Sequence, residues 1–169
     1  GMMLGGAFAG VWGSYLTGSA FVGLLFAMLA GALLGLIHAV LTIQFKTDHI
    51  ISGLGINLLS LGLTTVLMED IWGNRGRSGM VNGLGNVKIP GLIDIPVIGP
   101  IFGNTTILFY LLIVCMVVSW IVLYKTVFGL RVRVIGDNPK VADSLGINVY
   151  MMQYIGVIVC GILAGLGGA

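Results

Sequence analysis

Charge is scarce in this sequence. Only 8% of the 169 residues are Asp, Glu, Lys or Arg, against roughly a quarter in an ordinary soluble domain. The stretch 1–45 carries none of them, although it is longer than any run that a globular core hides. Hydrophobic residues make up 57% of the chain and the mean hydropathy is +1.09. The scarcity of charge excludes a soluble protein and predicts one that lies in a membrane.

Catalytic motifs are absent as well. The sequence has no Gly-x-x-x-x-Gly-Lys-Ser/Thr phosphate loop, so we expect no ATP hydrolysis by that route in this chain. No cluster of His, Cys and carboxylates has metal-ligand spacing. Glu69 and Asp70 are adjacent and therefore point to different faces of a helix, which is poor geometry for a catalytic pair. We expect no enzyme, no metal and no cofactor in this chain, and the net charge of +2 gives no indication of nucleic-acid binding.

The sequence has only two cysteines, and it does not begin with a methionine. Cys115 and Cys160 both lie in apolar stretches, which predicts buried free thiols and no disulfide. No signal peptide is visible at the start of the chain. Because both ends fall within apolar runs, we expect a fragment truncated at each end.

The apolar residues that dominate the chain fall into five runs. A helix needs about 20 apolar residues to cross the hydrocarbon core, and lipid offers no partner to unpaired backbone groups. The predicted spans are 1–16, 21–45, 50–68, 105–124 and 149–169. The predicted fold class is therefore all-α, a single polytopic helix bundle over 1–169 with about five spans.

Two polar connections separate these runs, 69–104 and 125–148. Lys and Arg are enriched on the cytoplasmic side of membrane proteins. Five basic residues fall on the side of 125–148, namely Lys46, Lys125, Arg131, Arg133 and Lys140. Three fall in 69–104, namely Arg75, Arg77 and Lys88. This count predicts that 125–148 is a cytoplasmic loop and 69–104 an extracytoplasmic one, beside which Trp72 fits an interfacial aromatic belt.

The cytoplasmic loop contains signals for one short helix. Asn138 suits the N-cap, Pro139 the first helical position, and Gly146 the left-handed residue that ends a helix. Val141 and Leu145 are four residues apart and share a face. A helix of two turns is unstable alone in water, so this one rests on lipid headgroups or on its own bundle, or docks a cytoplasmic partner.

The motifs around this helix resemble one permease family. They are Gly136-Asp137-Asn138-Pro139, Ala142, Gly146-Ile147, the run 161–169, Phe128-Gly129-Leu130-Arg131-Val132-Arg133, and the opening Gly1-Met2-Met3-Leu4-Gly5-Gly6-Ala7. Over essentially its whole length the chain resembles the permeases of bacterial ABC importers for branched-chain amino acids, ribose-type sugars and nucleosides. Its opening residues look most like the nucleoside branch.

The resemblance implies a function and a set of partners. It implies that the short helix is the coupling helix, seated in a groove of a separate ATPase subunit that carries the ATP. The implied coupling residues are Asn138, Pro139, Ala142, Leu145 and Gly146. It further implies a second permease subunit, an extracytoplasmic solute-binding protein, and a place in the bacterial plasma (inner) membrane. Nucleosides are the expected solute, with simple sugars or branched-chain amino acids as alternatives.

Small and polar residues form a stripe on the third predicted span. Gly53, Asn57, Ser60 and Thr64 follow three- and four-residue spacing and so share a helix face. One interpretation is a face that lines the translocation pathway and offers hydrogen bonds to a polar solute. The other is helix packing, with Asn57 bonded across the interface.

Other residues admit a functional and a plain interpretation. His38, near the end of the second span, is either part of a proton relay or simply hydrogen-bonded. Arg75 and Arg77 either contact a solute-binding protein or are solvated. Glycine pairs at four-residue spacing predict packing surfaces. These pairs are Gly6/Gly10, Gly31/Gly35 and Gly161/Gly165.

Three rival functions are weaker. An ion-coupled secondary transporter needs a coupling-ion site, usually buried carboxylates or unwound helices at mid-membrane, whereas all six carboxylates fall in or beside predicted loops. They are Asp48, Glu69, Asp70, Asp94, Asp137 and Asp143. An intramembrane enzyme lacks convergent acid, base or nucleophile groups. A non-transporting assembly subunit is the third.

Overall fold

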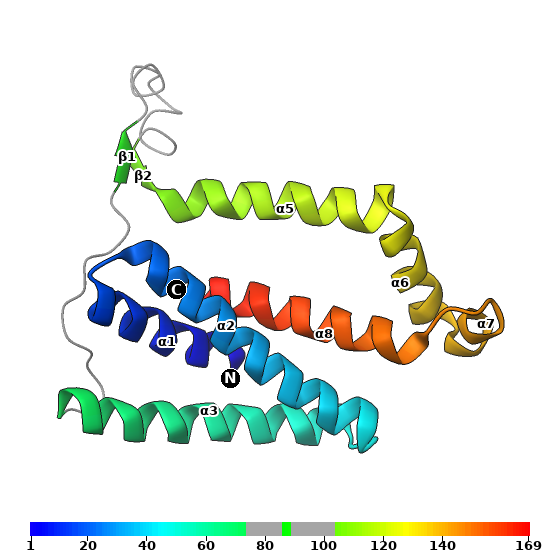
Figure 1. Ribbon diagram of the computed structural model, residues 1–169, viewed down its shortest axis with the longest axis horizontal. Helices are drawn as coiled ribbons and strands as arrows, with labels where there is room; N and C mark the ends of the chain where they lie inside the picture. Colours follow the sequence, from blue (N-terminus) through cyan, green and yellow to red (C-terminus); the bar gives the residue numbers. More distant parts are fainter. Residues whose placement is uncertain (74–85, 89–103) are drawn as a thin grey trace. The chain divides into compact units, whose positions relative to one another are not determined.

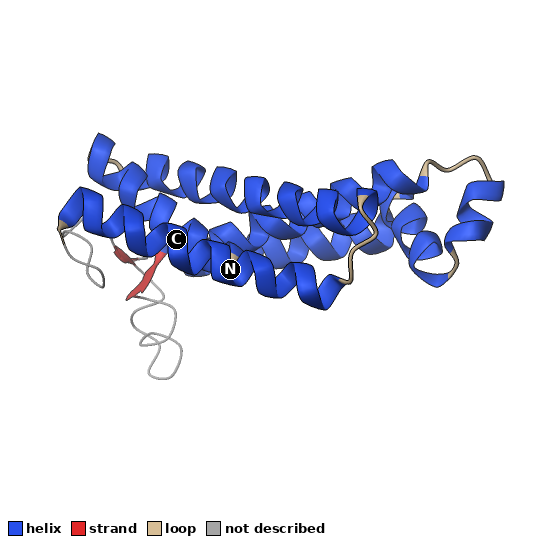
Figure 2. Cartoon of the chain, turned by 90° about the horizontal axis from the view of Figure 1, so that it is seen from below, coloured by secondary structure: helices blue, strands red, loops and turns tan. Residues whose placement is uncertain are grey.

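The computed structural model describes residues 1–73, 86–88 and 104–169. Its contacts divide the chain into two compact units, Gly1–Asn82 with Val134–Ala169, and Gly83–Arg133. In chain order (Figure 1) the elements are α1 Met2–Thr17, α2 Ala20–Ala39, the π-helical turn η1 Val40–Gln44, α3 His49–Trp72, β1 Asn86–Lys88, β2 Asn104–Thr106, α5 Ile107–Lys125, α6 Val127–Asp137, α7 Pro139–Ser144 and α8 Val149–Leu166. Apart from the two short strands, the described residues confirm the all-α prediction (Figure 2).

The first unit is built around the helices α1, α2 and α8. Helix α2 contacts both of the others, and the pairing of α2 with α8 is antiparallel. Gly31 lies against Gly161 and Gly165, whereas Gly35, one turn later on α2, lies against Gly161 and Val157. Residue numbers therefore rise along α2 as they fall along α8.

Backbone meets backbone in this core. A Cβ atom added at Gly31 would lie 2.2 Å from the carbonyl oxygen of Gly161, and one at Gly161 would lie 2.4 Å from the oxygen of Gly31. One added at Gly6 of α1 would lie 2.6 Å from the Cα of Gly165. No side chain fits at such separations, so the packing role predicted for the glycine pairs is confirmed.

Helix α3 packs against α1 and, over fewer residues, against α2. Its start is fixed by Asp48, whose Oδ1 accepts a hydrogen bond of 2.7 Å from the backbone N–H of Ile50. Its end extends to Trp72, whose ring packs edge-on against Phe8 and Tyr15 of α1 at centroid distances of 6.0 and 5.8 Å. The prediction that a loop begins at residue 69 is therefore wrong, because the aromatic contacts with α1 hold this last turn in the helix.

Three described helices are long and apolar enough to cross a membrane, Ala20–Gln44, His49–Trp72 and Val149–Leu166. A fourth span is counted if α5 and α6, which meet at a bend of 73°, form one crossing. Helix α1, predicted as a truncated span, has 16 residues. The membrane bundle is confirmed, and the five predicted spans correspond to α1, α2 with η1, α3, α5 and α8.

The second unit holds the strands, α5 and most of α6. The strands are antiparallel, with Asn86 opposite Thr106 and Lys88 opposite Asn104. Helix α6 was not predicted: 125–148 was expected to hold one short helix and holds two. A local cap explains its start, because the backbone N–H of Gly129 donates to Oγ1 of Thr126 at 3.3 Å. Two glycines and two arginines in eleven residues hide this helix from a search for apolar runs.

Candidate functional site

The predicted coupling helix is α7, and its first turn forms as expected. Oδ1 of Asn138 accepts hydrogen bonds from the backbone N–H groups of Lys140 at 3.1 Å and Val141 at 3.4 Å. Pro139 occupies the first helical position, where its missing N–H leaves nothing unpaired. The side chain of Asn138 thus satisfies two donors that a helix start leaves free.

The end of α7 is a Schellman motif. Gly146 is left-handed, with φ +75°. The backbone N–H of Ile147 donates to the oxygen of Ala142 at 3.1 Å, and that of Gly146 donates to the oxygen of Asp143 at 2.9 Å. Both ends of α7 are therefore confirmed as predicted, whereas its docking to an ATPase stays a prediction.

Helix α7 has one buried and one exposed side. Ala142 is fully buried, and α7 contacts α8. Val141 and Leu145 are exposed. The chain's own bundle thus takes up the alanine and leaves two apolar side chains facing outward from the end of the first unit.

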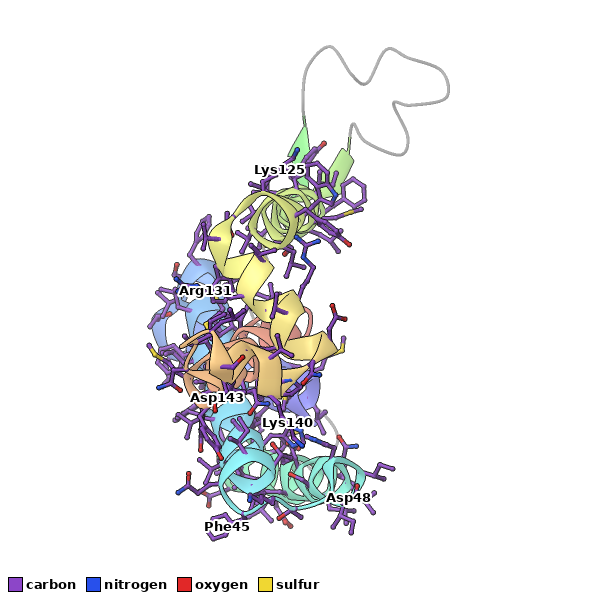
Figure 3. The ribbon with its side chains drawn as sticks, turned by 90° about the vertical axis from the view of Figure 1, so that its right-hand side faces the viewer. Phe45, Asp48, Lys125, Arg131, Lys140 and Asp143 are labelled. Atoms are coloured by element: carbon purple, nitrogen blue, oxygen red, sulfur yellow. The ribbon has the colours of Figure 1, made fainter. Side chains whose placement is uncertain are left out.

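The connection between α2 and α3 lies at this same end. The turn η1 contacts α8, whose first residues follow α7. Figure 3 looks onto this end of the first unit, where Phe45, Asp48, Lys140 and Asp143 are labelled. Phe45 is exposed there. The prediction that Lys46 lies on the same membrane side as Lys140 agrees with this arrangement.

The polar stripe on α3 is divided by its packing. Ser60 and Thr64 are buried, and they share their face with Ser52 and Ile56, which are also buried. Gly53 is half-buried and Asn57 is exposed. The buried row follows a strict four-residue spacing, and Gly53 and Asn57 lie one position further around the helix.

Hydrogen bonds along this face are mostly local. Oγ1 of Thr64 donates to the carbonyl oxygen of Ser60 at 2.7 Å. Asn57 lies against the start of α1, beside Gly1. The hydroxyl of Ser60 is buried and has no partner among the described residues. Helix packing at Asn57 and the lining of a pathway therefore both stay predictions.

His38 makes the hydrogen bond that its non-catalytic interpretation requires. Nδ1 of His38 lies 2.9 Å from Oγ of Ser52, and the ring of His49 has its centroid 6.4 Å away. Oγ1 of Thr42 donates to the carbonyl oxygen of His38 at 2.8 Å. Sequence reasoning missed Ser52 and His49. Their place just after a short turn, which folds α3 back beside α2, was the available signal.

The remaining predicted sites divide into those that the structure describes and those that it does not. Arg75 and Arg77 lie outside the described residues. No group of three metal-ligating side chains occurs within the described ranges. Both cysteines are free, as predicted, but Cys115 is half-buried and Cys160 is exposed. The prediction of burial is therefore wrong for Cys160 and holds only in part for Cys115.

Comparison with known proteins identifies a family. The family described as branched-chain amino acid transport system / permease component matches residues 1–169. The guanosine ABC transporter permease protein NupQ of Bacillus subtilis is 43% identical over 175 residues, which cover 99% of this chain and 55% of that protein. The nucleoside ABC transporter permease protein NupC of Lactococcus lactis is 42% identical over 162 residues, 95% of this chain and 50% of that protein.

A sugar permease is more distant. The putative glucose ABC transporter permease protein TsgC13 of Haloferax volcanii is 32% identical over 173 residues, 100% of this chain and 51% of that protein. The chain thus spans about half the length of these relatives. No solved structure matches it at a significant level. The match over all 169 residues and the apolar helices lead to one conclusion: the chain belongs to this family of ABC transporter permease components and is a multi-pass protein of the plasma (inner) membrane.

Proposed function

We propose that the chain is the membrane-spanning part of an ATP-driven importer whose solute is a nucleoside. The observation that carries this proposal is the identity of 43% and 42%, over nearly the whole chain, to permeases named for guanosine and for nucleosides. The identity to the permease named for glucose is lower, at 32%. Simple sugars are therefore the second candidate class of solute.

In this proposal α7 is the coupling helix. Val141 and Leu145 enter a groove of a separate ATPase subunit, which binds and hydrolyses the ATP. Their exposure supports this role, because two apolar side chains held outward by a capped helix form a rigid projection. A second permease subunit completes the transmembrane part, and a solute-binding protein delivers the nucleoside outside, where Arg75 and Arg77 contact it.

The packing of α7 suggests how movement reaches the bundle. Ala142 is buried, and α7 contacts α8. Helix α8 lies against α2 through Gly161 and Gly165. A displacement of α7 by the ATPase therefore pulls on α8, and α8 moves relative to α2. For transport, the two arrangements of the bundle must bind the ATPase with different affinity.

The polar face of α3 is the proposed lining of the pathway. Ser60 carries the clearest signal, because the residue is 1% exposed and its hydroxyl lacks a partner in the described part of the chain. Such a group costs free energy unless it gains a partner. A ribose hydroxyl supplies that partner when the bundle opens, and Asn57 and Thr64 flank the same region of the helix.

The placement of carboxylates argues against the ion-coupled alternative. Asp48 is an N-cap, Glu69 and Asp70 lie in the last turn of α3, and Asp143 lies in α7. Asp137 ends α6. Among the described residues, therefore, no carboxylate occupies the middle of a membrane helix.

Uptake of labelled guanosine tests the proposed solute. Cells with and without the full-length gene are compared, with excess ribose as competitor and with a protonophore added while ATP is maintained. We expect uptake that requires the gene, resists ribose and survives the protonophore. Competition by ribose would move the solute to the sugars. Loss of uptake with the protonophore alone would overturn ATP-driven transport.

The coupling assignment has its own test. In the full-length permease, Gly146→Val forces a β-branched side chain into a left-handed position, so the end of α7 distorts. Gly136→Val is the matched control, because Gly136 is in a helix with open space around it. We expect recovery of the ATPase subunit with the tagged permease to fall several-fold for Gly146→Val only. Equal recovery for both variants would contradict docking through α7.

A further inference from the structure

The junction between α5 and α6 is built as a sharp, fixed corner. The two helices meet at 73°. A Cβ atom added at Gly129 would lie 2.2 Å from the carbonyl oxygen of Leu123 and 2.4 Å from that of Val122, so α6 turns back tightly over the end of α5. Oγ1 of Thr126 donates to the oxygen of Val122 at 2.6 Å and accepts from the N–H of Gly129 at 3.3 Å. One side chain thus ties the last turn of α5 to the first turn of α6.

The corner lies where a membrane helix leaves the hydrocarbon. Helix α5 has 19 residues, a length of about 28 Å at about 1.5 Å per residue. This length nearly matches a hydrocarbon core of about 30 Å. Trp120, Tyr124 and Lys125 gather in its last turns, and Nζ of Lys125 lies 5.9 Å from the Trp120 ring centroid. Aromatic and basic residues in this position are typical of a membrane–water interface.

The bend then sends α6 along the interface. Membrane helices tilt by about 20° from the bilayer normal on average. A helix that leaves such a span at 73° runs close to the membrane plane. Helix α6 is therefore placed at the level of the headgroups and does not continue the crossing.

The outer face of α6 combines apolar and basic side chains. Val127 is 65% exposed and Leu130 is 55% exposed. At about 100° per residue, Arg131 lies on one side of this apolar pair and Arg133 on the other. An apolar strip flanked by arginines is the pattern of a helix that lies in a lipid interface, with its basic heads raised to the phosphates.

The two arginines have no acidic partner within the described ranges. The Arg133 guanidinium lies 5.0 Å from the centroid of the Tyr124 ring, whereas Arg131 makes no hydrogen bond, ion pair or ring contact with a described residue. Asp137 shares the exposed face but lies at the far end of α6, and it forms no ion pair with either arginine. Stacking on Tyr124 positions the Arg133 charge and leaves its donors available.

From this arrangement we propose that the outer face of α6, formed by Val127, Leu130, Arg131 and Arg133, binds the headgroup of an anionic phospholipid in the cytoplasmic leaflet. The guanidinium groups pair with the lipid phosphate, while Val127 and Leu130 contact the acyl chains at their upper end. Lys125, held over Trp120 at the corner, adds a third cation. The inference is independent of the transported solute.

Lipid retention on the full-length permease tests the proposal. The purified protein is offered phosphatidylglycerol and phosphatidylcholine in equal amounts, and the bound ratio is measured by native mass spectrometry. Each basic residue near an anionic surface contributes a factor of about five. We expect Arg131→Gln with Arg133→Gln to lower the preference for phosphatidylglycerol by about twenty-five-fold. The variant Arg131→Lys with Arg133→Lys keeps most of it.

A control with the same loss of charge separates a site from general attraction. Lys46→Gln with Lys140→Gln removes two cations from the same membrane side but none from α6. We expect its loss of preference to be at least several-fold smaller. Equal losses in the two double variants would overturn a site on α6, and so would a lysine variant that loses as much as the glutamine variant.

Two further measurements test whether something other than a lipid binds the outer face of α6. In the unaltered protein the preference falls as salt rises, because charge pairing is screened, and soluble glycerophosphoglycerol does not displace the lipid. Displacement by that soluble headgroup would overturn a lipid interface in favour of a free-phosphate site. Loss of the ATPase subunit from the double arginine variant, with lipid retention unchanged, would assign this face to protein docking.

Discussion

Single glycines determine how closely the helices of the first unit approach. Gly161 lies against Gly31, and an added Cβ would fall 2.4 Å from the Gly31 carbonyl oxygen. On the same helix, Gly156 has open space around it. Two chemically identical substitutions therefore meet opposite surroundings.

We expect Gly161→Ala to lower the stability of the full-length protein by about 1–3 kcal/mol, because the methyl group forces α8 away from α2. Gly156→Ala should leave stability unchanged or raise it slightly, since alanine favours the helix. Thermal unfolding in detergent, followed by tryptophan fluorescence, gives the comparison. A smaller loss at position 161 than at 156 would show that the glycine contacts do not hold the bundle.

The two buried serines of α3 form a second matched pair. Ser52 bonds to Nδ1 of His38, whereas the Ser60 hydroxyl has no partner in the described structure. We expect Ser52→Ala to cost about 1 kcal/mol, because the half-buried His38 ring loses its hydrogen-bond partner. Ser60→Ala should be neutral or slightly stabilising, since it removes an unpaired buried hydroxyl.

The same two variants distinguish a role of the α3 face in helix packing from a role in transport. Thermal unfolding measures the stability difference, and guanosine uptake measures function. If Ser60 lines the pathway, Ser60→Ala lowers uptake several-fold while the protein stays as stable as before. Unchanged uptake would leave helix packing as the role of this face.

At the scale of elements, the corner between α5 and α6 depends on Gly129. A methyl group at this position meets the carbonyl oxygens of Val122 and Leu123, which belong to the helix backbone and have no room to move aside. We therefore expect Gly129→Ala to open the corner, so that the bend between α5 and α6 falls below 73°.

Pulsed electron spin resonance between labels at Met116 and Asp137 measures this bend in the full-length protein, with the native cysteines replaced. The distance should lengthen in Gly129→Ala. Gly136→Ala is the control, because its surroundings are open. Equal distances in all three proteins would mean that another contact holds the corner.

Elements differed in how well the sequence predicted them. The ends of α7 were predictable because a capping asparagine, an N1 proline and a left-handed glycine act within a few residues of one another. Helix α6 was not, because its start depends on one threonine hydroxyl and its position on a tight approach to α5. The division of the α3 stripe was equally hidden, since burial of Ser60 and exposure of Asn57 depend on how α1 lies against α3.

At the scale of the whole molecule, the described helices predict which connections share a membrane side. The turn after α1 and the turn after η1 lie at opposite ends of a 25-residue span. We expect a cysteine at Ser19 to react with an impermeant maleimide in intact cells, and cysteines at Lys46 and Asp143 to react only after permeabilisation.

This expectation follows from the excess of basic residues on the side of 125–148, which is typical of the cytoplasmic side of a membrane protein. The native cysteines are replaced before labelling. Labelling of positions 46 and 143 in intact cells, with position 19 protected, would invert the orientation. Labelling of 46 and 143 from different sides would contradict the arrangement of the first unit.

The close approach of Gly31 and Gly161 also determines which interactions hold α2 against α8. Where a Cβ of Gly31 or Gly161 would strike a carbonyl oxygen, the native Cα hydrogen points at that oxygen. Such Cα–H···O contacts are weak but directional. At these contacts no side chains interdigitate, so none has to be displaced before the helices move. The contact between α2 and α8 therefore allows the two helices to slide along each other. A single added methyl group is enough to block this movement.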